Sequence, residues 1–305
     1  GYEQMMRVCP DYKFGVGASR FARMTVCDWS GFDADVKEIQ DGIRAGVNIC
    51  MPFVYLALGD SPELQKLVAQ DYRRAELAAI DSLGPIPRKA QSGKVRIAYY
   101  SADFREHPVS HLMVGALEAH DRSKFELFAF AFGPGVRDAM RTRVSAAFDR
   151  FIDVTDMSDR DVAEQSRALG IDIAINLGGF TEYERTGIFA HRCAPVQANY
   201  LGYSGTMGVD YMDYIFVDQT LVPTDMRPQY VEKVACLPDS YLVYGSPPAG
   251  RAVAPARATL GLPDAAFVFC CFNNSYKILP AVFASWMRIL HSVPNSVLWL
   301  SEANS

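Results

Sequence analysis

The segment VRIAYYSADFREHPVSHLMVGALEAH, residues 95–120, decides the fold of this 305-residue chain. Its first part, Val95–Tyr100, is a nearly continuous apolar run of strand length, which is typical of a strand buried on both faces of a sheet. A polar loop, Ser101–His107, follows this run. Pro108 then suits the first turn of a helix, because an N–H there would have no helical partner. We therefore predict a strand, a loop and a helix over Pro108–His120.

The same alternation continues along the chain. Further strand-like runs are Phe125–Phe132, Phe151–Val154, Ile171–Leu177, Val196–Tyr200 and Tyr214–Val217. Helical stretches lie between several of them, at Asp138–Phe148, Asp159–Leu169 with Ser158 as its cap, and Glu184–Arg192. Apolar strands that alternate with helices indicate a parallel sheet covered on both faces. The sequence therefore predicts an α/β fold with a doubly wound, Rossmann-like lobe.

The regions on either side differ in character. The front is helical, with apolar spacing over Ser19–Trp29, Ala34–Gly46 and Pro62–Leu83, and a linker around Pro85–Lys89. After a Pro/Ala/Gly-rich linker, Gly245–Arg257, come a strand (Phe267–Phe272), a helix (Pro280–His291) and a strand (Ser296–Leu300). A single βαβ unit cannot bury both faces of its sheet, so we expect a truncated second Rossmann-like lobe. The predicted domains are 1–90, 91–245 and 246–305.

Composition excludes several classes of protein. Thirty Lys and Arg against 35 Asp and Glu give a net charge of −5, whereas a chain that binds bulk nucleic acid carries a basic excess. The apolar runs are far shorter than the ~18 residues that span a bilayer, and no signal peptide opens the chain. Seven scattered cysteines without a CxxC pair predict a reducing, cytoplasmic location and no metal site.

Chemistry is expected in the loops that follow the strands, because ligands of open α/β sheets collect beyond the carboxyl ends of the strands. His107 would lie at the cap of the helix that Pro108 opens, beside backbone donors and a positive dipole end. A histidine at this place can act as a base or bind a phosphate or sugar hydroxyl. The alternative is a histidine that only caps the helix.

Three further loops have weaker signals. In Asn176–Thr181 the paired glycines Gly178 and Gly179 would let a ligand approach the backbone, and Thr181 could bond a hydroxyl; a tight turn explains the glycines equally well. Leu201–Gly208 contains three glycines, yet it is not GxGxxG, so a dinucleotide fingerprint is rejected. In Phe272–Ile278, Lys277 and neighbouring amides could clamp a diphosphate, or the lysine could be an ordinary surface residue.

Taken together, these loops resemble one family. The segments are HPVSHLM (107–113), GIDIAINLGGFT (170–181), FAHRCAPVQANYLGYSGTMGVDYMDYIFVD (189–218), CCFNNSYKI (270–278) and VPNSVLWL (293–300). This set resembles the O-GlcNAc transferase / SPINDLY family of glycosyltransferases. VCDWSGFD (26–33) resembles the connector between the tetratricopeptide repeats and the catalytic region of that family. Residues 1–12 would then be the tail of the last repeat.

The resemblance implies the first lobe of a GT-B type enzyme that transfers N-acetylglucosamine from UDP-GlcNAc to Ser or Thr of acceptor proteins, with inversion and without a metal. Carried over by position, His107 matches the active-site histidine, as base or positioning group. Gly178, Gly179 and Thr181 match the loop near the sugar. The residues that match those holding the uridine diphosphate are Asn274 and Lys277, with Tyr276 beside them.

Some positions depart from the family pattern. Asn274 stands where some members have glutamine, and Cys193 and Ser204 replace prolines. Most of the second lobe is missing, so this chain would be an incomplete fragment of the enzyme. Alternatives are a SPINDLY-type protein O-fucosyltransferase that uses GDP-fucose, a non-catalytic binding module linked to repeats, and a sugar-nucleotide epimerase. Self-association through the helical repeats is a further expectation.

Overall fold

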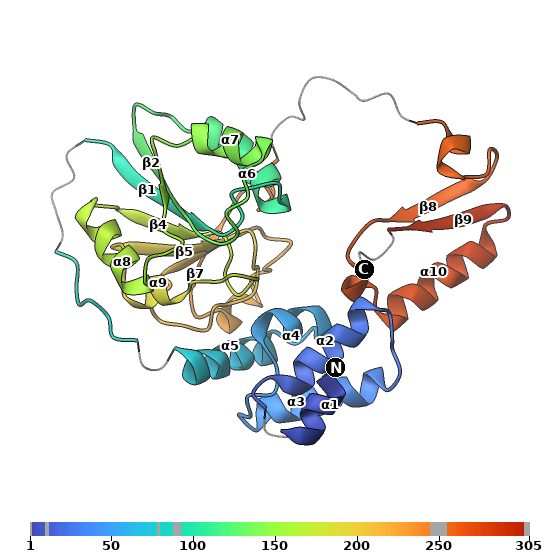
Figure 1. Cartoon of the computed structure of the whole chain (residues 1–305). Coiled ribbons are helices and arrows are strands. Elements are labelled where there is room, and N and C mark those ends of the chain that lie inside the picture. Colours follow the sequence, from blue (N-terminus) through green and yellow to red (C-terminus); the bar gives the residue numbers. More distant parts are fainter. Residues whose placement is uncertain (1, 10–11, 78–79, 88–92, 245–254, 302–305) are drawn as a thin grey trace. The chain divides into compact units, whose positions relative to one another are not determined.

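The computed structural model describes the chain except for residues 1, 10–11, 78–79, 88–92, 245–254 and 302–305 (Figure 1). It divides into two compact units, residues 60–246 and residues 1–59 together with 247–305. These units do not coincide with the predicted domains 1–90, 91–245 and 246–305, because a helix at residues 62–76 groups with the larger unit. The predicted linkers fall largely on residues 88–89 and 245–254, which lie outside the described residues.

The larger unit contains a parallel sheet of seven strands in its described part. In sequence order they are β1 (Val95–Ser101), β2 (Phe125–Ala131), β3 (Arg150–Asp153), β4 (Ile173–Asn176), β5 (Val196–Tyr200), β6 (Tyr214–Val217) and β7 (Lys233–Cys236). Their spatial order is β3-β2-β1-β4-β5-β6-β7. The predicted Rossmann-like sheet is confirmed. The strand order reverses between β1 and β4, and ligands of such sheets bind beyond the carboxyl ends of the strands at this switch point.

Helices cover both faces of this sheet (Figure 1). They are α6 (Pro108–Glu118), α7 (Ala139–Ala146), α8 (Asp159–Ala168) and α9 (Gly187–Ala190); the same unit also contains α5 (Pro62–Glu76) and a 3-10 turn η1 (Arg227–Gln229). Apolar side chains of α6 and α7 pack with Tyr99 on one face. On the other face the Tyr100 ring stacks on Phe130, with centroids 4.6 Å apart, and its hydroxyl donates to Ser166 of α8 at 2.6 Å. Alternate residues of β1 therefore point to opposite layers.

Several predicted boundaries are corrected by local interactions. Ser158 caps α8 as predicted, and its hydroxyl accepts from the Asp161 N–H at 3.2 Å. The helix predicted over Glu184–Arg192 is shorter, because the Glu184 carboxylate accepts from both the N–H and the hydroxyl of Thr186. Strand β7 was not predicted. It is a four-residue edge strand whose terminal residues are exposed, so its sequence shows no continuous apolar run.

The smaller unit combines helices from the front of the chain with the C-terminal segment. Its elements are α1 (Tyr2–Val8), α2 (Gly15–Thr25), α3 (Phe32–Arg44), α4 (Pro52–Leu58), the 3-10 turns η2 (Arg257–Leu260) and η3 (Ser275–Lys277), β8 (Phe267–Cys271), α10 (Pro280–Ser292) and β9 (Ser296–Leu300). Strands β8 and β9 pair in parallel, which confirms the predicted βαβ unit. Helix α2 starts four residues earlier than predicted, and α4 was not predicted. No helix within the described ranges is long and apolar enough to cross a membrane.

Candidate functional site at the carboxyl ends of β1 and β4

The loop after β1 is held by hydrogen bonds at Asp103. The Asp103 N–H donates to the Ser101 hydroxyl at 2.9 Å, and its carbonyl accepts from the Ser110 hydroxyl of α6 at 2.5 Å. Asp103 and both serines are buried. The loop is therefore fastened to the strand that precedes it and to the helix that follows, which fixes the direction of its side chains.

His107 is the N-cap residue of α6, as the sequence predicts. The Val109 N–H donates to Nδ1 of the His107 ring at 3.3 Å. A nitrogen that accepts a hydrogen bond has no proton, so this bond assigns the proton of the neutral ring to Nε2. The Asp103 carboxylate lies 3.6 Å from the same Nδ1, and the side chain of His107 is 32% exposed. The histidine caps the helix and also presents an N–H edge away from the cap.

Burial favours the neutral form of His107 and outweighs the nearby carboxylates. Burial lowers the pKa of His107 and Arg105 lowers it further, while the carboxylates of Asp103 and Glu182 oppose this effect. Burial raises the pKa of Asp103, and the charges of His107 and Arg105 oppose that rise. Arg105 also donates to Asp103 at 3.3 Å. Glu182 belongs to the loop after β4, so the two loops lie within electrostatic reach of each other.

The loop after β4 is organised by Asn176. Its buried side-chain oxygen accepts from the N–H groups of Gly178 and Gly179, both at 3.0 Å. Thr181 donates its hydroxyl proton to the Gly178 carbonyl at 2.9 Å. The two glycine amides are therefore used within the loop and do not face a ligand as free donors. What the loop offers a ligand is the hydroxyl oxygen of Thr181 as an acceptor, together with close approach to the backbone.

Gly179 is required by packing as well as by conformation. Its φ is +60°, and a Cβ there would lie 2.4 Å from Cβ of Tyr203. Tyr203 belongs to the glycine-containing loop 201–208, is fully buried, and accepts a hydrogen bond from Gln65 through its hydroxyl. The carboxylate of Glu232 accepts from the Thr206 hydroxyl at 2.6 Å and fastens this loop further. Loop 201–208 is thus a packed support for the β4 loop.

The fourth predicted loop lies in the smaller unit. Asn274 and Lys277 are exposed. The Tyr276 ring instead packs on Phe21 of α2, with centroids 4.8 Å apart, and on Phe53 of α4, at 6.1 Å. Tyr276 therefore anchors its loop to α2 and α4. Its predicted role near a diphosphate stays a prediction. The predicted site residues His107, Gly178, Gly179 and Thr181 belong to the larger unit, and Asn274, Tyr276 and Lys277 belong to the smaller one.

Comparison with known proteins decides the family. The sequence profile of glycosyl transferase family 41 matches residues 85–247 and 245–303. The chain belongs to this family. It is 34% identical over 295 residues to the probable UDP-N-acetylglucosamine–peptide N-acetylglucosaminyltransferase SEC of Arabidopsis thaliana, covering 90% of this chain and 30% of that protein. The corresponding SPINDLY protein of the same plant is 33% identical over 207 residues, covering 67% and 22%.

A solved structure extends the likeness to the fold. An O-GlcNAc transferase mutant of Thermobaculum terrenum superposes with a TM-score of 0.78 at 28% identity, covering 98% of this chain and 57% of that chain. This confirms the predicted fold class and the family resemblance over nearly the whole chain. The family 41 chain spans less than a third of the two curated plant relatives. Among the described residues, no group of three His, Cys, Asp or Glu side chains could hold a metal ion.

Sequence reasoning about this family 41 chain did not single out Asp103, Arg105 or Glu182. Asp103 precedes His107 by four residues across a loop, a spacing that has no fixed meaning outside a helix. Glu182 follows the predicted Thr181 directly, so only the pairing of β1 with β4 brings it near the histidine. No local sequence signal therefore marks these residues.

We expect the ring pKa of His107 to lie below the usual 6.5 and to fall further in Asp103→Asn. Removing the carboxylate removes a charge that favours the imidazolium form. Imidazole nitrogen chemical shifts followed by NMR against pH measure this directly. Glu106→Gln is the matched control, because Glu106 contacts His111 and not His107. An unchanged or raised His107 pKa in Asp103→Asn would contradict the assignment.

Replacing Gly179 by alanine is expected to destabilise the larger unit by about 2 kcal/mol or more, because the left-handed backbone and the clash with Tyr203 both oppose a Cβ. Urea unfolding followed by circular dichroism measures the change. Gly135→Ala is the control. A Cβ on Gly135 would meet no atom within 4 Å, and its φ is not positive, so its effect is expected to stay within about 0.5 kcal/mol. Equal effects of the two substitutions would refute the packing argument.

Glu232→Gln tests the buried carboxylate that fastens loop 201–208. Burial raises the pKa of Glu232 in the folded state. The folded protein therefore binds this proton more tightly, and the resulting stability is present below the unfolded pKa and is lost as pH rises through the folded pKa. The free energy of unfolding of the variant, relative to the parent, is expected to increase as pH rises above about 4.3, the usual pKa of a glutamate in an unfolded chain. Urea titrations across this range measure it, with the exposed Glu63→Gln as control; a flat difference would contradict the prediction.

Proposed function

We propose that this chain forms the first lobe and the beginning of the second lobe of an inverting protein N-acetylglucosaminyltransferase. The donor would be UDP-GlcNAc and the acceptors would be Ser and Thr hydroxyls of proteins. The observation that carries the proposal is the family 41 match over both segments that hold the predicted site residues, residues 85–247 and 245–303. The relatives named for this activity support the proposal. The chain covers 30% of the SEC protein and 57% of the Thermobaculum terrenum chain.

In this proposal His107 positions the reacting groups through a donated hydrogen bond. Its Nδ1 accepts from Val109, so the neutral ring has its proton on Nε2 and can donate to a sugar or phosphate oxygen. The buried Asp103, 3.6 Å from Nδ1, would stabilise the ring whenever it takes up a second proton. An acceptor hydroxyl needs a proton acceptor. The exposed carboxylate of Glu182, on the β4 loop and within electrostatic reach of His107, has that capacity.

Lys277 supplies the charge for the leaving diphosphate. It is exposed and makes no ion pair within the part of the chain that the structure describes, while its Nζ lies 5.8 Å from the Tyr276 ring centroid. An ammonium group that is not neutralised can meet charge that develops on a leaving phosphate, which is the task a metal performs elsewhere. We therefore expect that catalysis needs no metal or cofactor besides the donor.

A cytoplasmic location and self-association through the helical front end also stay predictions.

The test is to incubate the full-length protein with UDP-GlcNAc or with GDP-fucose and an acceptor protein, and to measure the nucleotide released and the mass added to the acceptor. We expect UDP release with addition of N-acetylhexosamine. Lys277→Ala is expected to lower kcat/KM by about 100-fold, the usual effect of removing one charge-stabilising group. The control is Lys124→Ala, because Lys124 is an exposed residue directly before β2 and pairs with Asp121.

Each other outcome decides against part of the proposal. GDP release from GDP-fucose, with none from UDP-GlcNAc, would establish the fucosyltransferase alternative. No release of either nucleotide would favour the binding module. Unchanged turnover in Lys277→Ala would show that this lysine does not hold the diphosphate, whatever the donor is.

A further inference from the structure

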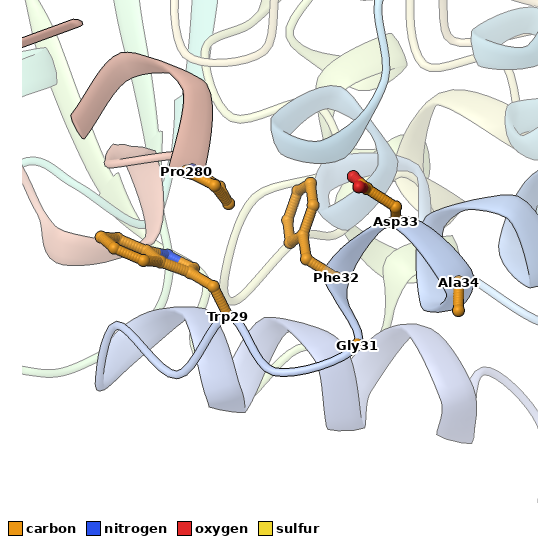
Figure 2. A pocket seen from close by; sticks show the side chains of 6 residues that line it. All are labelled: Trp29, Gly31, Phe32, Asp33, Ala34 and Pro280. Atoms are coloured by element: carbon orange, nitrogen blue, oxygen red, sulfur yellow. The ribbon is translucent and has the colours of Figure 1, made fainter. Parts of the chain in front are cut away.

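A pocket of about 270 Å³ lies in the smaller unit, and none of the residues that line it is used in the proposed reaction. It lies where the segment between α2 and α3 meets the start of α10 (Figure 2). The lining residues are Trp29, Gly31, Phe32, Asp33, Ala34 and Pro280. All but Pro280 come from the segment around VCDWSGFD, residues 26–33. The proposed function gives this segment no task.

The walls of the pocket are of two kinds. Figure 2 shows Trp29 and Pro280 near each other on one side of the Phe32 ring, and the Asp33 carboxylate on its other side. The Trp29 ring packs on Phe283 of α10, with centroids 5.2 Å apart, and this contact holds the indole in place. The pocket thus offers an apolar, aromatic stretch and, beyond it, one carboxylate.

The charge beside the pocket is negative. Arg20 pairs with Asp35 at 3.0 Å, and Arg23 pairs with Asp28 at 2.9 Å and with Asp35 at 3.1 Å. Asp33 makes no ion pair among the residues that the structure describes, and it is exposed. Two arginines against three aspartates leave one negative charge, and Asp33 is the carboxylate that faces the pocket.

We propose that this pocket binds a basic side chain, lysine or arginine, presented by a polypeptide partner. Such a side chain has an apolar stem and a charged tip, which matches an aromatic wall that leads to a carboxylate. A cation near the face of Trp or Phe is attracted by the ring as well. Phe32 already shows this behaviour within the chain, because the Arg20 guanidinium lies 5.4 Å from the centroid of its ring.

The experiment uses the full-length protein and three short capped peptides of the form Gly-X-Gly, in which X is arginine, lysine or citrulline. Citrulline has nearly the shape of arginine and no charge. The readout is the indole N–H resonance of Trp29, assigned by its loss in Trp29→Phe. We expect the arginine and lysine peptides to shift this resonance saturably, and the citrulline peptide to bind more weakly.

Two substitutions distinguish binding in the pocket from nonspecific attraction of basic peptides to an acidic protein. Asp33→Asn is expected to weaken binding of the basic peptides about threefold to fivefold, the effect of one exposed ion pair. Glu38→Gln, on an exposed face of the same helix, is expected to leave binding unchanged. Equal binding of arginine and citrulline, an equal loss in the two variants, or no shift with any peptide would overturn the proposal. These readouts do not depend on turnover, so they stand apart from the test of the proposed transferase.

Discussion

One side chain organises the centre of the larger unit. The Asn176 side-chain oxygen, buried at the end of β4, accepts from the N–H groups of Gly178 and Gly179. Because these bonds turn the chain sharply, Gly179 enters the left-handed region and comes so close to Tyr203 that no Cβ fits. The Asn176 side chain is buried and satisfies one buried and one partly buried donor, so it is costly to replace, because the Gly179 N–H would lose its partner away from water.

The turn after β4 also determines which side chains lie near the loop after β1. Strands β1 and β4 are adjacent and parallel, so their following loops emerge at the same edge of the sheet. The β4 loop therefore brings Glu182 into electrostatic reach of His107, which α6 holds as its N-cap. A buried carboxylate, a neutral imidazole with its proton on Nε2 and a second carboxylate therefore lie within electrostatic reach of one another at the switch point of the sheet. In a family 41 chain, this is the arrangement that the proposed sugar transfer would use.

The sequence predicts those features that local physical chemistry determines. The apolar run of Val95–Tyr100 and the Pro108 start signal place β1, α6 and the capping role of His107 correctly. Features set by tertiary contacts could not be predicted. The short edge strand β7 has no apolar run, and the glycine amides of the β4 loop are used by Asn176 instead of a ligand. The contact of Tyr276 with Phe21 joins residues 255 positions apart, which no local pattern encodes.

We infer that the loops after β1 and β4 form one donor-binding edge. Hydrogen–deuterium exchange of the full-length protein, with and without UDP-GlcNAc, tests this claim most directly. We expect peptides covering residues 102–111 and 177–183 to gain protection together when the donor binds. Protection confined to other parts of the chain, with both loops unchanged, would contradict it.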